Sequence, residues 1–257
     1  MTRRKIIICS LLTPIILVVV TVGVIAVSNP WLLKEGYLYV EHMLRGRSTN
    51  HGIDATKTRV DGIDVSHHNG WIDWEKVAGN PQIKFAYIKA TQGVGYTDPM
   101  YKRNFRGAKK AGLNVGTYHF FTSKKSGERQ FNYFKSIVGR NPGNIIPMVD
   151  VEYAGGIEGM TASQLQSELT VFCELIKNEY GRKPIIYTSS SIYNNMLGGK
   201  FDSYYIWIAR YGITPNLKSN SKHNVWQFSE NGIVEGIDYN VDLNRFENGM
   251  TIEKLKF

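Results

Sequence analysis

Two carboxylic acids, Asp150 and Glu152, alternate with valines in the segment PMVDVEY at residues 147–153. Because successive side chains of a β-strand point to opposite faces, these two acids share one face. A strand rise of about 3.3 Å per residue places their Cβ atoms about 6–7 Å apart. Glycosidases with a covalent intermediate separate their carboxyl groups by about 5–5.5 Å, and inverting ones by about 6.5–9.5 Å. The spacing therefore fits a glycosidase pair, one acid donating a proton and the other supporting positive charge on the sugar, without deciding the stereochemistry.

Each acid taken alone also has a structural interpretation. The pair can face solvent or form salt bridges. Asp64, in GIDVSHHNG, can cap the end of a strand, and Asp242, in NVDLN, can brace a loop through a hydrogen bond. The chemical interpretation therefore depends on whether the fold brings these acids together.

From residue 60 the sequence alternates short apolar segments with longer helical patterns, which is typical of β/α units. We expect strands at residues 60–66, 84–91, 114–121, 144–152, 183–189, 204–210, 224–229 and 241–246, and helices near 74–78, 99–111, 126–138 and 162–180. Thr161 suits the N-cap of the last helix, and Gly181 follows its end. After residue 183 the strands come closer together, and their connections are rich in Gly, Asn and Ser.

Eight strands with this spacing predict an α/β fold of the TIM type, a closed β/α barrel with helices around its first part only. An open doubly wound sheet is the alternative, but the chain has no glycine-rich dinucleotide turn to support it. In a β/α barrel the chemistry gathers at the carboxyl ends of the strands. We therefore expect one site that combines the four acids with side chains of other strands, namely Lys89, Tyr118, Tyr187, Trp207 and Gln227. Lys89 is expected to pair with a barrel carboxylate.

No cofactor or metal is expected at this site. His67 and His68 are adjacent and point apart on an extended chain, and no HxxxH or HExxH pattern accompanies them. The glycines at 93 and 95 lack the Lys-Ser/Thr continuation of a phosphate loop, and no GxSxG segment marks a serine nucleophile.

Seven segments follow one another in a recognisable order: GIDVSHHNGWIDWEKV, FAYIKATQGVGYTDPMYKRNFRGAKKAGLNVGTYHFF, IPMVDVEY, KPIIYTSS, IWIAR, VWQFSE and VDLNRF. Over about residues 60–247 the chain resembles the glycoside hydrolase family 25 lysozymes, also called Chalaropsis-type or N,O-diacetylmuramidases. The resemblance implies a barrel of five β/α units followed by three strands. It also implies cleavage of the β-1,4 bond between N-acetylmuramic acid and N-acetylglucosamine in bacterial peptidoglycan.

The resemblance further implies roles for single residues. Glu152 matches the general acid/base and Asp150 its partner, which stabilises the cationic centre or orients the 2-acetamido group. Asp64 and Asp242 match the other acidic positions, and the positions that contact sugar are matched by Tyr118, Tyr187, Trp207 and Gln227. Gln92 departs from the family, which commonly has Glu there. The alternative function is a noncatalytic peptidoglycan-binding module of a membrane-anchored envelope assembly; a metal-dependent deacetylase lacks its histidine ligands.

The N-terminus predicts a membrane anchor. Residues 6–27 carry no charge and follow the basic TRRK. About 20 apolar residues span a bilayer, whereas a cleaved signal peptide has a shorter apolar core. We therefore expect a cytoplasmic basic end and transmembrane anchor at 1–28, a juxtamembrane spacer at 29–59 and a muramidase domain at 60–257 outside a bacterial cell membrane. Cleavage near Ala26 is the alternative.

Charge and cysteine content limit the binding partners and disulfide bonds that the chain can have. The net charge of +9 favours polyanionic surroundings such as anionic lipid or cell wall, and no nucleic-acid motif is present. Of the two cysteines, Cys9 lies in the apolar segment, so Cys173 has no disulfide partner in the exported part. The expected partners are peptidoglycan glycan strands, the membrane and secretion or conjugation machinery.

Overall fold

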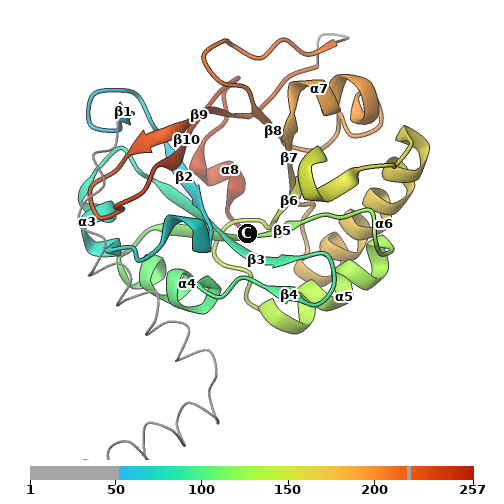
Figure 1. Cartoon of the computed structure of the whole chain (residues 1–257), viewed down its shortest axis with the longest axis horizontal. Helices are drawn as coiled ribbons and strands as arrows, with labels where there is room; N and C mark the ends of the chain where they lie inside the picture. Colours follow the sequence, from blue (N-terminus) through green and yellow to red (C-terminus); the bar gives the residue numbers. More distant parts are fainter. Residues whose placement is uncertain (1–51, 219–220) are drawn as a thin grey trace, which may run out of the picture. The chain divides into compact units, whose positions relative to one another are not determined.

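The computed structural model describes residues 52–218 and 221–257, which form a closed barrel (Figure 1). Eight strands follow one another around the ring, and pairing of β8 with β9 and of β10 with β2 closes it. These strands are β2 (Gly62–Val65), β3 (Phe85–Gln92), β5 (Asn114–Phe120), β6 (Met148–Val151), β7 (Ile185–Ser189), β8 (Ile206–Ala209), β9 (Val225–Ile233) and β10 (Val241–Phe246). The predicted barrel is confirmed, and an open sheet is excluded.

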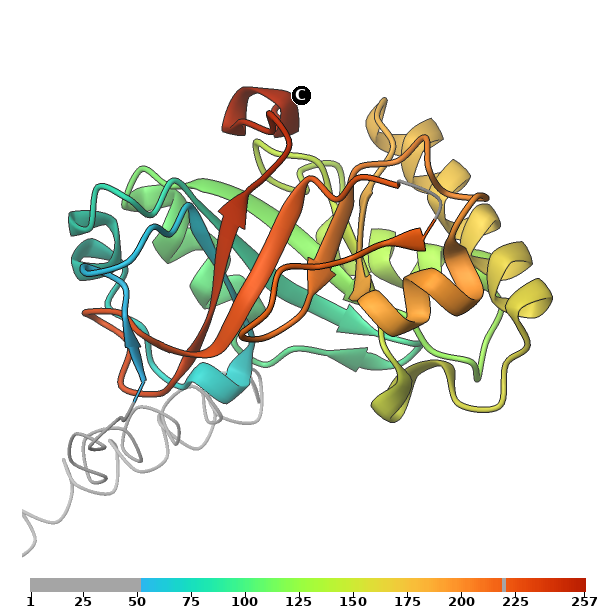
Figure 2. The same cartoon turned by 90° about the horizontal axis from the view of Figure 1, so that it is seen from above.

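The last part of the barrel departs from a regular β/α pattern in strand direction. Every neighbouring pair of barrel strands is parallel except those of β10, which runs antiparallel to both β9 and β2. The connection from β9 to β10 is residues 234–240, too short for the crossover that a parallel neighbour needs. None of the described helices therefore covers the outer side of β9 and β10 (Figure 2).

Helices cover the outside of the first five barrel strands. After β2, β3, β5, β6 and β7 follow α3 (Trp74–Gly79), α4 (Tyr101–Lys110), α5 (Gly127–Val138), α6 (Ala162–Tyr180) and the short α7 (Ser190–Ile192) with η3 (Tyr193–Leu197). The expected five units and three further strands are thus present. Helix α6 has the predicted ends: Thr161 accepts a hydrogen bond from the Gln164 amide, and Gly181 takes the left-handed conformation.

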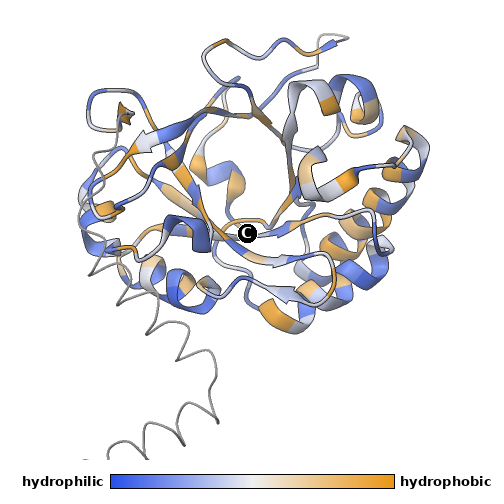
Figure 3. Cartoon of the chain, in the orientation of Figure 1, coloured by the Kyte–Doolittle hydropathy of each residue, from blue (hydrophilic) through white to orange (hydrophobic). Residues whose placement is uncertain are grey.

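Two apolar clusters, one inside the ring and one between strands and helices, fix which way each strand residue points. Met148 on β6 packs in the interior cluster with Tyr87 and Trp207. Val149 and Val151 pack in the outer cluster with residues of α6, whose ribbon carries both polar and apolar segments (Figure 3). Because side chains alternate along a strand, Asp150 faces the interior. The short C-terminal helix α8 (Ile252–Leu255) adds Leu255 to the interior cluster.

Smaller elements complete the described part. A two-residue strand, β4 (Tyr96–Thr97), pairs with the end of β3, and the short helical turns η1 (His67–Asn69) and η2 (Tyr153–Ile157) follow β2 and β6. None of these was predicted. Strands of two residues leave no periodic pattern in a sequence, because tertiary pairing alone creates them.

The described chain enters the barrel through β1 (Ile53–Asp54), which pairs in parallel with the end of β9. Ala55 behind it is fully buried. Residues assigned to the predicted spacer are therefore part of the folded domain. The predicted membrane segment at 6–27 lies outside the described residues. Within residues 52–218 and 221–257, no helix combines the length and apolar character that a membrane crossing requires.

Candidate active site

Four acids lie at the carboxyl end of the parallel strands, as predicted. Asp64 near the end of β2 and Asp242 on β10 are direct partners across the antiparallel pair. Asp150 on β6 is in register with Phe120 on one side and Tyr187 on the other. Glu152 is the first residue after β6. Side chains of three strands and one strand end thus form one acidic cluster.

Asp64 is held by two amides. The Gln227 Nε2 atom donates to both carboxylate oxygens at 3.1 and 3.3 Å, and Asn244 Nδ2 donates to Oδ2 at 2.7 Å. Each amide is itself oriented. The hydroxyls of Tyr187 and Tyr211 donate to Gln227 Oε1 at 2.8 and 2.9 Å.

The Trp207 indole completes this network from within the barrel. Its Nε1 atom donates to Asn244 Oδ1 at 2.9 Å. Trp207 has no exposed surface, so it offers no face to a ligand in this structure. Its contribution to the site passes through Asn244 to Asp64. Gln227, with 1% of its surface exposed, also acts through a neighbouring carboxylate.

Asp64 and Asp242 differ in protonation. Burial raises the pKa of Asp64 to about 6, while hydrogen bonds from Asn244, Gln227 and Asp242 oppose this rise. Burial, together with the charge of Asp64, raises the pKa of Asp242 to about 9. At neutral pH, Asp242 is therefore protonated and donates a hydrogen bond to ionised Asp64, because the shared proton favours the acid with the higher pKa.

Burial also raises the pKa of the other two acids. The pKa of Asp150 is well above its ordinary value because of burial and the nearby charge of Glu152. Burial raises the pKa of Glu152, and the nearby Tyr187 hydroxyl and the charge of Lys89 lower it. The side chain of Asp150 is 7% exposed, and no hydrogen bond within the described residues reaches its Oδ1 atom. Each of these two acids disfavours the ionisation of the other, so the pair keeps one proton at a pH at which exposed carboxyls have lost theirs.

Lys89 supplies the positive charge beside this pair. Burial lowers its pKa, while the charges of Asp150, Asp98 and Glu152 raise it. Its Nζ atom donates to Gln92 Oε1 at 2.9 Å and lies 4.6 Å from the centre of the Phe120 ring. The expected ion pair with a carboxylate is not formed; Lys89 instead bonds a neutral amide. Gln92, which departs from the family pattern, is therefore a direct partner of the site's lysine.

The remaining predicted residues line the same interior. Tyr118 and Tyr187 are 7% and 5% exposed and pack in the interior cluster with Met148. Nearby acids reinforce the effect of burial on both phenols, which keeps their pKa far above neutral pH and their hydroxyls protonated. The Tyr118 hydroxyl is therefore a hydrogen-bond donor, and that of Tyr187 donates to Gln227.

Two residues of the network were not predicted. Asn244 lies two positions after Asp242 in NVDLN, the same spacing that marked Asp150 and Glu152, so the period-two pattern pointed to it. Tyr211 follows β8 at the carboxyl end and is 45% exposed. A rule that counts every polar side chain within two residues of a strand end would have included both.

The adjacent histidines contact an aspartate and each other. His67 Nδ1 lies 2.8 Å from Asp98 Oδ2, and the His67 ring centre lies 3.9 Å from that of His68. No cluster of three or more metal-ligating side chains occurs in the part of the chain that the structure describes. These contacts link η1 to the segment after β4.

Comparison with known proteins agrees with this geometry. The family model described as "Glycosyl hydrolases family 25" matches residues 63–237. Lysozyme M1 of Streptomyces globisporus is 33% identical over 204 residues, 75% of this chain and 69% of the relative. A bacterial lysozyme from Streptomyces coelicolor has a TM-score of 0.67 at 33% identity, over 77% of this chain and 96% of that one. A family 25 glycosyl hydrolase from Bacillus anthracis has a TM-score of 0.70 at 28% identity, over 82% of this chain and 100% of that one. This chain belongs to glycosyl hydrolase family 25.

Proposed function

We propose that this protein is a peptidoglycan hydrolase of the lysozyme type. It cleaves the β-1,4 bond between N-acetylmuramic acid and N-acetylglucosamine and so remodels the cell wall locally. Membership of family 25 and its lysozyme relatives support the activity. The observation that carries it in this chain is the buried acidic cluster, in which Asp64 is ionised, Asp242 is protonated and the Asp150–Glu152 pair keeps a proton. Glycosidic bond cleavage needs both forms side by side.

In the proposed reaction Glu152 donates its proton to the glycosidic oxygen as the bond to the anomeric carbon breaks. Asp150, whose Oδ1 atom has no hydrogen-bond partner among the described residues, faces the positive charge that develops at that carbon or the acetamido group beside it. Water then supplies a hydroxyl to the anomeric carbon, and its proton returns to Glu152. Asp64, held by Gln227 and Asn244, orients the substrate from the opposite side of the barrel mouth.

The test is turnover of purified peptidoglycan by the wild type and by Glu152→Gln. We expect soluble fragments with reducing muramic acid ends from the wild type and a rate at least about 100-fold lower from the variant, the scale of a lost general acid. Mass analysis of the fragments identifies the bond. Equal binding of glycan by both proteins with no turnover by either would show a noncatalytic binding module instead. Acetate release that a chelator blocks would show a deacetylase.

The proposed place of action is the outer face of a bacterial cell membrane, with the basic end of the chain in the cytoplasm. The uncharged segment at 6–27, directly after TRRK, supports this proposal. An anchored enzyme acts only within reach of its tether, which suits opening the wall for an envelope-spanning secretion or conjugation machine.

A further inference from the structure

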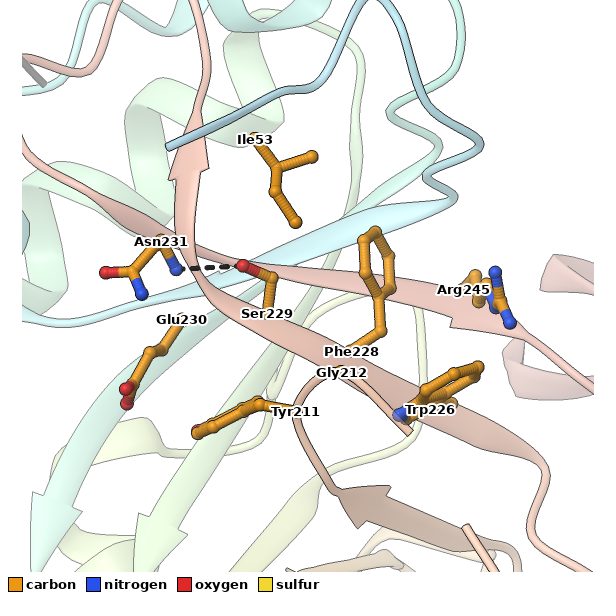
Figure 4. A pocket seen from close by; sticks show the side chains of 9 residues that line it. All are labelled: Ile53, Tyr211, Gly212, Trp226, Phe228, Ser229, Glu230, Asn231 and Arg245. Carbon is orange, nitrogen blue, oxygen red and sulfur yellow. Dashed lines mark hydrogen bonds between the residues drawn. The ribbon is translucent and has the colours of Figure 1, made fainter. Parts of the chain in front are cut away.

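A pocket of about 300 Å³ lies on the outer side of β9 (Figure 4), and none of the four acids lines it. It occupies the part of the barrel that none of the described helices covers. Its walls come from three regions of the chain: β1, the segment after β8, and the β9–β10 pair. The side chains that matter are Ile53, Tyr211, Trp226, Phe228, Glu230 and Arg245.

Aromatic rings form the floor and one side of this pocket, and they are fixed in place. The Trp226 indole donates to the Arg210 carbonyl oxygen at 2.7 Å. The Trp226 and Phe228 ring centres are 6.1 Å apart, and the Arg245 guanidinium lies 4.1 Å from the Trp226 ring centre. Trp226 is only 6% exposed and its ring is covered by Arg245, so it supports the pocket, while the Tyr211 ring, 45% exposed, and the partly exposed Phe228 ring offer preformed apolar faces. Such faces suit the C–H faces of a sugar ring.

The charges of the pocket favour a neutral ligand. Arg245 is paired with Glu247, with Nε and Oε1 2.8 Å apart. Glu230 forms no hydrogen bond or ion pair with any other described residue, so its carboxylate is the uncompensated charge here. A carboxylate accepts hydrogen bonds from hydroxyl and amide N–H groups and repels anions. This combination fits an N-acetylhexosamine unit and disfavours an acidic peptide.

Tyr211 joins the pocket to the acidic cluster. Its ring lines the pocket, and its hydroxyl donates to Gln227, which in turn holds Asp64. The charge of Glu230 also raises the pKa of Glu152 and of Asp242, which shows that the pocket lies within electrostatic range of both. A glycan strand that leaves the cleavage site across Tyr211 would therefore meet the pocket.

We propose that this outer pocket is a second carbohydrate site, which binds an N-acetylhexosamine unit of the peptidoglycan strand outside the cleavage site. The proposal rests on the proposed function, since it takes the substrate of the acidic cluster as its ligand. The site would retain the enzyme on long glycans and contribute little to cleavage of short ones.

Binding is tested with full-length Glu152→Gln protein in mild detergent, labelled with 5-fluorotryptophan. The chain has five tryptophans, so the fluorine spectrum is simple, and Trp226→Phe assigns its signal. Titration with tetra-N-acetylchitotetraose is expected to shift the Trp226 signal in a saturable way. Phe228→Ala and Ile53→Ser, which alter opposite walls, are each expected to raise the dissociation constant at this signal about fivefold.

Turnover is tested in the active protein with intact sacculi and with a short soluble muropeptide glycan. Both wall variants are expected to lose about fivefold in rate on sacculi at low substrate and to keep the wild-type rate on the short glycan. Phe257→Ala removes an exposed phenylalanine outside the pocket and serves as the matched control. Thermal unfolding shows whether each variant is folded. If Phe228→Ala does not fold, Ile53→Ser alone tests the proposal.

The outcomes separate the two proposals. Turnover of sacculi with no response of Trp226 to the oligosaccharide, or with wall variants equal to wild type, overturns the second site and leaves the lysozyme function intact. A saturable Trp226 shift without any turnover overturns the lysozyme function and supports a carbohydrate site.

Discussion

At the scale of single residues, the site depends on a proton shared across β2 and β10. The pKa of Asp242 is about 9 in the folded state, whereas the ordinary pKa of an aspartic acid is 3.8. The folded state therefore binds more protons than the unfolded state between these values. The stabilisation from protonated Asp242 is complete below a pH of about 4 and is lost as the pH rises toward 9.

Asp242→Asn removes this titration but keeps a donor for Asp64. We expect the free energy of unfolding of the wild type to fall more steeply than that of the variant between about pH 5 and 8, by up to about 4 kcal/mol. Urea unfolding at several pH values measures this difference. Glu75→Gln, which changes an exposed acid of α3, should follow the wild type. Parallel curves for wild type and Asp242→Asn would contradict the shared proton.

Trp207 gives a second test at this scale. The family resemblance implies that it contacts sugar, whereas the structure buries it completely with its indole bonded to Asn244. If it positions Asn244, Trp207→Phe leaves a buried amide oxygen unpaired, which costs about 1–3 kcal/mol of stability. We then expect kcat to fall with little change in KM, since Asp64 loses its orientation. Steady-state kinetics on soluble glycan, with unfolding curves, measure both.

Trp74→Phe is the matched control for this substitution. Trp74 is also buried and donates to an asparagine oxygen, Asn104 Oδ1, at 3.3 Å, but it lies on α3 outside the ring. It should lose stability without a change in kcat. A rise in KM with unchanged kcat in Trp207→Phe would instead indicate direct contact with the sugar.

At the scale of elements, the sequence predicted those helix and strand bounds that depend on residues close together along the chain. Helix α6 and strand β10 have the predicted bounds, because a capping threonine, a terminal glycine and a strand pattern lie within the segments themselves. The antiparallel direction of β10, the two-residue strands and the Lys89–Gln92 contact were not predicted. Each depends on which distant segment lies alongside, and a single sequence carries no direct record of that.

The cap of α6 offers a test that is independent of the site. Thr161 accepts from the Gln164 amide, and the Gln164 side chain bonds back to the Thr161 amide. Thr161→Ala removes the first of these bonds and should reduce the free energy of unfolding by about 1 kcal/mol, whereas Thr161→Ser should retain most of it. Chemical unfolding measures the change. Since α6 packs on the outer side of β6, kcat should stay at the wild-type value; a large loss of kcat would show that the helix does more than support the strand.

At the scale of the whole molecule, the chain enters the barrel at the end that carries the acids. Strand β1 pairs with Gly232 and Ile233, the last residues of β9, and β9 runs parallel to β8 toward the carboxyl end. Ile53 of β1 also lines the outer pocket. The first described residues therefore lie beside the acid-bearing end of the barrel.

The predicted membrane anchor at residues 6–27 has a measurable consequence. If residues 6–27 remain as a transmembrane helix, the full-length chain should stay in the membrane pellet after washing with about 1 M salt, which screens charge attraction but leaves hydrophobic insertion intact. Replacing three apolar residues of this segment by lysine should release the protein, because each charge at the bilayer centre costs about 2.5–3.5 kcal/mol. Three leucine substitutions in the same segment are the control and should leave it in the pellet. Recovery of wild-type protein in the medium, lacking its first residues, would show that the segment is a cleaved signal and that the enzyme acts without a tether.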